Sequence, residues 1–204
     1  MIEYGIKTVI DLRAESERIG SPGPPFSQFQ SVSPVPPAQT EAGKDALEFL
    51  HRPLVDDETV PFLNEAATMP DRYRLMLDRC QPELGAIFNA IAQAEGPVLF
   101  HCFAGKDRTG LVAAMMLSLA GVEPEAIGSD YAETDSQLAD RYAEWLAKAA
   151  PDRIESMRDE LRCPPDWMLS TLEYAEQKWG GLESYLEAAG VAPVDMDRLN
   201  TKLT

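Results

Sequence analysis

Three short hydrophobic runs in the first half of the chain predict strands. Residues 6–12 are rich in β-branched side chains, residues 46–55 form a second run, and residues 97–101 form a third. Runs of this length and composition are typical of buried strands. The third run is hydrophobic on both faces, as in the centre of a parallel sheet, so we expect it to be a central strand.

Helical spacing of hydrophobic residues dominates the rest of the chain. A predicted helix runs from residue 69 to residue 80, resumes over 82–94 and stops at Gly96–Pro97. Another covers residues 109–120 and ends at Gly121. Everything beyond is predicted to be helical, with breaks near Pro124, Pro151, Pro164–Pro165, Gly180–Gly181 and Gly190.

Two segments are predicted to be loops. Residues 20–37 contain six prolines, which forbid regular helix, and residues 55–62 follow the second strand. Strands that alternate with helices predict an α/β fold, with a central, mostly parallel sheet flanked by helices and a helix-rich C-terminal half. With no internal repeat and no second boundary, residues 1–204 are expected to form a single domain.

The charge balance narrows the classes of partner. The chain has 18 Lys and Arg against 34 Asp and Glu, a net charge of −16. Such a surface attracts neither nucleic acid nor an anionic membrane, although a local pocket can still bind a small anion. No hydrophobic stretch approaches the ~20 residues of a membrane span, so no integral membrane association is expected.

The cysteines and the first residues bear on the compartment. The chain has three cysteines: Cys80, Cys102 and Cys163. Their odd number and their spacing do not fit a disulfide framework, which favours a protein of the reducing cytosol. The first residues show no signal-peptide pattern. We therefore expect a cytoplasmic protein, with export by another route left open and the oligomeric state undetermined.

The string HCFAGKDRTG, residues 101–110, joins the third strand to a helix. Ligands bind at this edge of α/β sheets, and the free N–H groups and dipole of a helix N-terminus attract anions. Gly105 permits a tight turn with inward amides. Arg108 offers a planar pair of donors that matches two phosphate oxygens. The loop therefore predicts a site for a tetrahedral oxyanion.

Cys102 lies at the start of this loop, in the field of the helix N-terminus and the cations. Such surroundings favour the thiolate, which is the nucleophilic form of cysteine. A sulfur below an oxyanion cradle is suited to attack on phosphorus through a phosphocysteine, while the cradle stabilises the transition state. Cys80 and Cys163 lack this setting and are interpreted as buried structural residues.

Other interpretations of the loop fail on its spacing. A nucleotide P-loop needs a glycine where Phe100 stands and a Ser or Thr where Asp107 stands. A zinc site needs paired ligand spacing, which the His and Cys residues do not have, so no metal is expected. A merely structural cysteine would leave Gly105, Arg108 and Thr109 without a reason to occur together.

Cys102, five intervening residues and then Arg108 and Thr109 match the signature of the cysteine-dependent protein tyrosine phosphatase superfamily, which the chain resembles. The full string HCFAGKDRTG is similar to a bacterial group of tyrosine phosphatases and to some phosphoinositide phosphatases. Further resemblance lies in residues 5–17, 130–134 and 179–191. Members usually have a further segment before the first strand, so we expect either a smaller sheet here or a shortened version with altered activity.

The resemblance implies a role for each loop position. Cys102 is the nucleophile, and Arg108 binds the phosphoryl group together with the loop amides. Thr109 donates its hydroxyl to the sulfur or serves as a helix N-cap. Lys106 adds charge at the rim and favours substrates with more than one phosphate, or is simply solvated. The predicted substrate-binding residues are Phe103, Ala104, Gly105, Lys106, Asp107, Arg108 and Thr109.

A carboxylic acid is also needed, because the leaving group requires a proton. Asp56 follows the second strand and resembles the acid-bearing loop of the superfamily, with Asp57 beside it. Asp107, inside the phosphate loop, is the rival candidate. We predict Asp56 as the acid.

The sequence thus predicts a phosphomonoesterase that needs no cofactor. Its expected substrates are phosphotyrosine proteins, with phosphoserine, phosphothreonine or phosphoinositides as further candidates. One alternative is a non-catalytic phosphate-binding module derived from a phosphatase. A sulfur-transfer enzyme is another, which the His-Cys and Arg-Thr frame disfavours.

Overall fold

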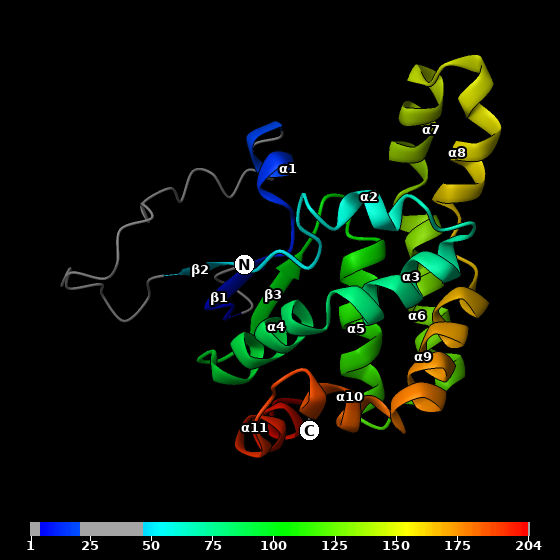
Figure 1. The fold of residues 1–204 in the computed structure, drawn as a ribbon. Coiled ribbons are helices and arrows are strands. Elements are labelled where there is room, and N and C mark those ends of the chain that lie inside the picture. The colour runs from blue at the N-terminus through cyan, green and yellow to red at the C-terminus, as the bar shows by residue number, and fades with distance from the viewer. Residues whose placement is uncertain (1–4, 21–46, 204) are drawn as a thin grey trace.

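The computed structural model describes residues 5–20 and 47–203 (Figure 1). The strands are β1 (Thr8–Asp11), β2 (Glu48–His51) and β3 (Val98–His101). The helices of the first half are α1 (Glu15–Gly20), α2 (Val60–Leu63), α3 (Met69–Arg79), α4 (Gln81–Gln93) and α5 (Asp107–Leu119). Those that follow are α6 (Pro124–Gln137), α7 (Ala139–Lys148), η3 (Pro151–Arg153), α8 (Ile154–Leu161), α9 (Pro165–Trp179), α10 (Leu182–Ala188) and α11 (Pro193–Leu203).

The three described strands form a parallel sheet in the order β2-β1-β3. Asp11 at the end of β1 is level with His51 and His101, so the strands end at one edge. The predicted α/β class is confirmed. The prediction of β3 as the central strand is wrong, because β1 lies between the other two. The side chains of β3 are only partly buried, and hydrophobic character on both faces does not fix the position of a strand within the sheet.

One hydrophobic cluster joins the sheet to the helices. Ile10 of β1 is fully buried, as are Phe88 of α4 and Met115 of α5. Helices α10 and α11 pack against α4, and α6 and α9 pack against each other and against α5 (Figure 1). The loop between β3 and α5 is therefore anchored on both sides by buried elements.

Helices α7 and α8 lie side by side and project beyond the rest of the molecule (Figure 1). Tyr142 of α7 is buried, whereas Arg141 on the same helix is exposed. Trp145 of α7 and Glu160 of α8 line the same cavity as residues of the β3–α5 loop, so the pair forms one wall beside that loop.

The predicted breaks among the C-terminal helices are confirmed, since prolines or glycines stand at each of those boundaries. The break between α6 and α7 was not predicted, because Leu138 there is neither. The predicted loop 55–62 overlaps the short helix α2, which begins at Val60 and continues to Leu63. In the turn before this helix, Asp56 accepts a hydrogen bond from the backbone N–H of Thr59. The predicted loop 20–37 lies outside the described residues from position 21 onward.

Within the described ranges, no helix is long and apolar enough to cross a membrane.

Candidate active site

The β3–α5 loop leaves the sheet at His101 and enters α5 at Asp107. Cys102 follows the strand directly and is 7% exposed. The ring nitrogen Nδ1 of His101 donates to the carbonyl oxygen of Cys102 at 3.1 Å. Gly105 has a φ of 81°, and no atom lies near the position of a Cβ, so the left-handed backbone itself requires glycine there. The chain therefore turns at Gly105, as its sequence predicts.

Arg108, in the first turn of α5, makes a two-pronged contact with Glu17 of α1. Its two terminal nitrogens donate to the two carboxylate oxygens at 2.5 and 2.6 Å. Burial works against the charge of Arg108, but the Glu17 carboxylate and the nearby Cys102 sulfur raise the pKa of Arg108 above its usual value. The guanidinium is thus fixed in place and charged beside the sulfur.

The position of the Glu17 side chain is fixed by the turn after β1. Its carboxylate accepts the backbone N–H of Ala14 at 2.8 Å as well as the guanidinium of Arg108. Burial raises the pKa of Glu17, but the hydrogen bonds and charge of Arg108 outweigh this and hold it below its usual value. Glu17 is therefore a carboxylate near neutral pH.

Lys106 points into the protein, although it was expected either at the rim or in solvent. Its side chain is 4% exposed, and Nζ donates to the backbone carbonyl of Glu160 at the end of α8. Asp107 lies 3.1 Å from the same nitrogen, and Trp167 lies below it with its ring centroid 5.7 Å away. Lys106 therefore connects the loop to α8.

Asp107 is held by a buried pair of tyrosines. The hydroxyl of Tyr73 donates to the carboxylate of Asp107 at 2.6 Å, and the hydroxyl of Tyr131 lies 2.6 Å from that of Tyr73. Burial, with the Asp107 charge next, raises the pKa of Tyr73 far above its usual range, so Tyr73 stays a donor. One oxygen of Asp107 is thereby fixed while the side chain remains one-third exposed.

Asp56 and Asp57 face different surroundings. Asp56 accepts the backbone N–H of Thr59 at 2.8 Å, and the hydrogen bonds from Thr59 hold its pKa below the usual value. Asp57 accepts from the hydroxyl of Ser16 on α1 and lines the same cavity as Cys102. Asp56 is not among the residues that line it.

Thr109 is the third residue of α5, so it is not the N-cap, which is Lys106. Its hydroxyl oxygen is buried and has no hydrogen-bond partner among the described residues. A buried hydroxyl without a partner is costly. Thr109 therefore has a hydroxyl available to a neighbouring acceptor.

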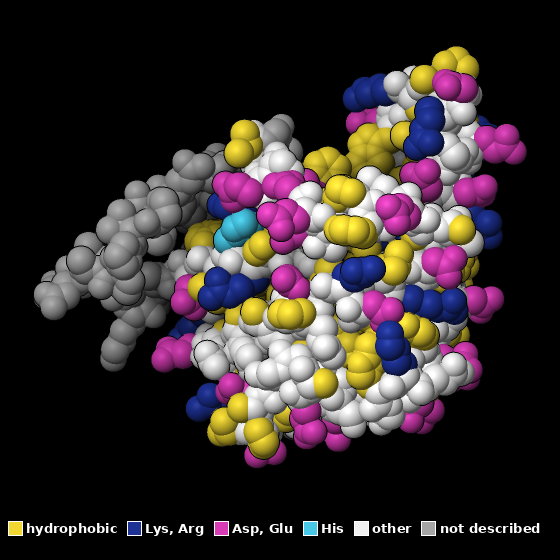
Figure 2. All heavy atoms as spheres, viewed as in Figure 1, with side chains coloured by type: hydrophobic (Ala, Val, Ile, Leu, Met, Phe, Trp, Pro, Cys, Tyr) yellow, Lys and Arg dark blue, Asp and Glu magenta, His cyan; other side chains and the backbone are white. Residues whose placement is uncertain are grey.

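A cavity of about 620 Å³ opens over the loop. Figure 2 shows hydrophobic side chains gathered in the recess between α2 and the α7–α8 pair. The cavity is lined by the loop residues Cys102, Phe103, Ala104, Lys106, Asp107 and Arg108, by Ala14, Ser16 and Glu17, by Val55, Asp57, Val60, Pro61 and Leu63, by Met69, Arg72 and Met76, and by Trp145, Glu160 and Leu161. Phe103, 44% exposed, stacks on Trp145 with the ring centroids 6.1 Å apart.

Cys80 and Cys163 are buried away from this cavity. Burial raises the pKa of Cys80 to about 12 and that of Cys163 to about 11. All three cysteines are free thiols. The interpretation of Cys80 and Cys163 as buried residues is confirmed.

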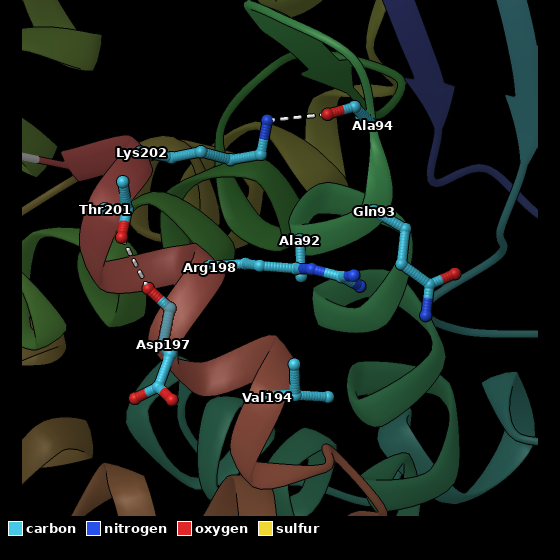
Figure 3. Close-up of a pocket in the computed structure, with 8 residues that line it drawn as sticks. All are labelled: Ala92, Gln93, Ala94, Val194, Asp197, Arg198, Thr201 and Lys202. Atoms are coloured by element: carbon cyan, nitrogen blue, oxygen red, sulfur yellow. Dashed lines mark hydrogen bonds between the residues drawn. The ribbon is translucent and has the colours of Figure 1, made fainter.

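A second hollow lies between α4 and α11 (Figure 3). Lys202 there donates to the carbonyl oxygen of Ala94 at 2.7 Å, and Arg198 pairs with Asp195 at 2.7 Å. Lys202 thus contacts the end of α4, and Arg198 pairs within α11. No cysteine or histidine is among the described residues that line this hollow. We take the cavity over Cys102 as the candidate active site.

No group of three or more His, Cys, Asp or Glu side chains in the described part of the chain is placed to hold a metal ion. The positive charge in the candidate site comes from Arg72, Lys106 and Arg108.

A parallel α/β sheet with a cysteine–arginine loop between a strand and a helix N-terminus defines the class of cysteine-dependent phosphatases. The comparison with protein families is more specific. Residues 1–204 match the tyrosine phosphatase family, and the chain belongs to it.

Two relatives illustrate the similarity. A tyrosine-protein phosphatase of Nostoc commune is 29% identical over 98% of this chain, which spans 66% of that protein. The triple specificity protein phosphatase PtpB of Mycobacterium tuberculosis is 29% identical over 96% of this chain, which spans 81% of that protein.

Sequence reasoning missed Glu17 and Tyr73, which contact the loop from α1 and α3. Neither residue lies in the loop motif, and each reaches it through the fold, from 91 and 34 positions away. Glu17 does fall within the segment 5–17 that resembles the superfamily, but nothing in that pattern indicates a contact with Arg108.

Proposed function

We propose that the chain hydrolyses phosphotyrosine through a phosphocysteine intermediate on Cys102. The observation that carries this proposal is the position of Cys102 and Arg108 in one cavity, at the N-terminus of α5. A thiol below a guanidinium and a helix N-terminus is suited to attack on a bound phosphoryl group. Membership of the tyrosine phosphatase family supports the same reaction.

In the first step the sulfur of Cys102 attacks phosphorus. The S–P bond forms while the P–O ester bond breaks, and the departing oxygen takes a proton from a carboxylic acid. Arg108 and the loop amides bind the equatorial oxygens, whose charge they match in the transition state. In the second step water attacks phosphorus, the S–P bond breaks, and the carboxylate takes the proton of the water. The buried hydroxyl of Thr109 is available to donate to the departing sulfur.

We infer that Asp107 is the acid in preference to Asp56. Asp107 lines the cavity, and the Tyr73 hydroxyl fixes one of its oxygens. Asp56 does not line the cavity, and its carboxylate accepts the backbone N–H of Thr59 in its own turn. Asp56 stays a prediction that the geometry does not favour, and Asp57 is the other carboxylate on the cavity wall.

The cavity supports an aryl substrate. Phe103 and Trp145 form a stacked aromatic pair on its wall, and aromatic rings bind well to such surfaces. A phosphorylated tyrosine on a protein is therefore the proposed natural substrate class. Phosphoserine, phosphothreonine and phosphoinositides remain further candidates, and the name of the mycobacterial relative records a triple specificity for that protein.

Residues 1–204 are proposed to act as one phosphatase domain, since a single hydrophobic cluster joins the sheet to the helices of both halves. The cytoplasm is the proposed compartment, because three free thiols, one of them the nucleophile, suit reducing conditions.

Turnover of p-nitrophenyl phosphate and of thiosulfate tests this function. We expect phosphate release from the first, no sulfur transfer from the second, full activity in EDTA, and loss of turnover in Cys102→Ser with phosphate binding retained. Phosphate binding without turnover in the unaltered protein would instead indicate a non-catalytic module, and sulfur transfer would indicate a rhodanese-like enzyme.

A further inference from the structure

Three cationic side chains line the candidate active-site cavity, and one of them lies outside the phosphate loop. Lys106, Arg108 and Arg72 line the cavity. Arg108 donates to both oxygens of Glu17, and Lys106 donates to the Glu160 carbonyl and pairs with Asp107. Two of the three cations are therefore already engaged by the protein.

Arg72 differs from both. It lies in the first half of α3, where Met69, Arg72 and Met76 recur on the face that lines the cavity. Its side chain is half-buried. Throughout residues 5–20 and 47–203, its guanidinium makes no hydrogen bond, ion pair or ring contact, although its neighbour Arg74 pairs with Asp71 at 3.3 Å.

None of the carboxylates that line the cavity forms an ion pair with Arg72. Four line the cavity, and each has another partner. Glu17 is taken by Arg108, Asp57 by Ser16, Asp107 by Tyr73 and Lys106, and Glu160 by Arg153. Arg72 is thus a partly desolvated guanidinium that faces a cavity and keeps its planar donors available, which is the arrangement that binds a carboxylate or phosphate.

The cavity also has room for more than a phosphoryl group. At about 620 Å³ it lies within the range of small-molecule sites, and its lining extends from the loop to α2, α3 and α7. A ligand whose phosphoryl group lies in the loop and which also pairs with Arg72 carries a second anionic group. A phosphotyrosine peptide with an acidic side chain and a phosphoinositide bisphosphate both have this property. The aromatic wall of Phe103 and Trp145 favours the peptide, and the net charge of −16 disfavours a phosphoinositide in an anionic membrane.

We propose that Arg72 forms a second anion-binding subsite, which takes the carboxylate of an acidic residue next to the phosphotyrosine in the substrate. This inference rests on the proposed function, because it assumes that a phosphotyrosine occupies the loop. It assigns Arg72 to substrate selection and leaves the chemical step to the loop.

The test compares two phosphotyrosine peptides that differ only in one flanking residue, Glu or Gln. Affinities are measured by calorimetry in the Cys102→Ser background, where turnover does not interfere. We expect the Glu peptide to bind about tenfold more tightly than the Gln peptide, as a charge-assisted contact would give. Arg72→Gln should abolish this preference and leave the affinity for the Gln peptide unchanged, and Arg72→Lys should restore part of it.

Arg74→Gln is the matched control, because Arg74 lies on the same helix and pairs with Asp71 instead of lining the cavity. It should keep the preference. A preference that survives Arg72→Gln would overturn the proposal, as would an equal loss for both peptides. Loss of affinity for a water-soluble phosphoinositide bisphosphate, with the peptides unaffected, would overturn the peptide assignment.

Turnover of p-nitrophenyl phosphate by the unaltered protein and by the control Arg74→Gln separates this proposal from the proposed function. This substrate carries no second anion, and Arg74 does not line the cavity, so we expect both proteins to hydrolyse it at rates within about twofold. Absence of hydrolysis in both would contradict the proposed function, while the peptide affinities would still decide the role of Arg72.

Discussion

Arg108 divides its donors between Glu17 and the cavity. Two terminal nitrogens bind Glu17, and one of them lies 3.5 Å from the Leu12 carbonyl. A guanidinium has further N–H donors, which remain for a phosphoryl group. Glu17 is therefore a positioning residue, since it orients the group that binds the substrate.

Replacing Glu17 tests this positioning role. Glu17→Gln keeps the shape but removes the charge, so we expect kcat/KM for p-nitrophenyl phosphate to fall about tenfold and the inhibition constant of inorganic phosphate to rise in parallel. Faster turnover with tighter phosphate binding would instead show that Glu17 competes with the substrate for Arg108.

The acid assignment is tested by the leaving group. Asp107→Asn should slow the hydrolysis of alkyl phosphates strongly and that of aryl phosphates weakly, because aryl leaving groups need less protonation. Asp56→Asn should show no such dependence. Rates across a series of leaving groups measure both. The opposite pattern would restore Asp56 as the acid, and a dependence in Asp57→Asn alone would move the role there.

At the scale of elements, two helices meet at a glycine. A Cβ at Gly85 in α4 would lie 2.0 Å from the backbone oxygen of Ala189 after α10. Gly85→Ala must therefore push these elements apart, and we expect a loss of about 1–3 kcal/mol in the free energy of unfolding. Denaturant unfolding measures it, and Ala86→Ser, at an exposed neighbour, is the control. An unchanged midpoint in Gly85→Ala would contradict the close approach.

Most helices and strands can be predicted from the local sequence pattern. The exceptions have physical explanations. Prolines and glycines mark the C-terminal breaks because they act on their own backbone. Helix α2 has only four residues, too few for a period, and the α6–α7 break at Leu138 carries no breaker. The order of the strands depends on pairing between distant segments, so residues 97–101 alone could not place β3 beside β1.

At the scale of the molecule, the candidate site also has residues that a local pattern predicts and residues that only the folded chain brings to it. Cys102, Gly105 and Arg108 lie within seven consecutive residues, in the β3–α5 loop and the first turn of α5, so a local motif is enough to predict them. Glu17 and Tyr73 reach the loop through the fold, and the cavity wall at Arg72 and Trp145 comes from helices on either side. Such contacts exist only once the chain is folded.

The charge pairing also links stability to pH. The pKa of Glu17 is lowered in the folded protein, so its contribution is present above its unfolded pKa and disappears as pH falls through the folded value. We expect Glu17→Gln to be less stable than the unaltered protein near neutral pH, and we expect this difference to shrink once the pH falls below about 4.3, the ordinary pKa of glutamate, so that it is smaller at pH 3 than at pH 7. Urea unfolding at both pH values measures this. A constant difference would contradict the charged pair.

The covalent role of Cys102 is tested most directly by the mass of the protein during turnover. The protein is mixed with p-nitrophenyl phosphate, quenched in acid and measured intact, then digested to locate any added group. We predict a species heavier by one phosphoryl group, located on Cys102 and absent from Cys102→Ser. Turnover without this species, or a phosphoryl group on another residue, would contradict the phosphocysteine mechanism.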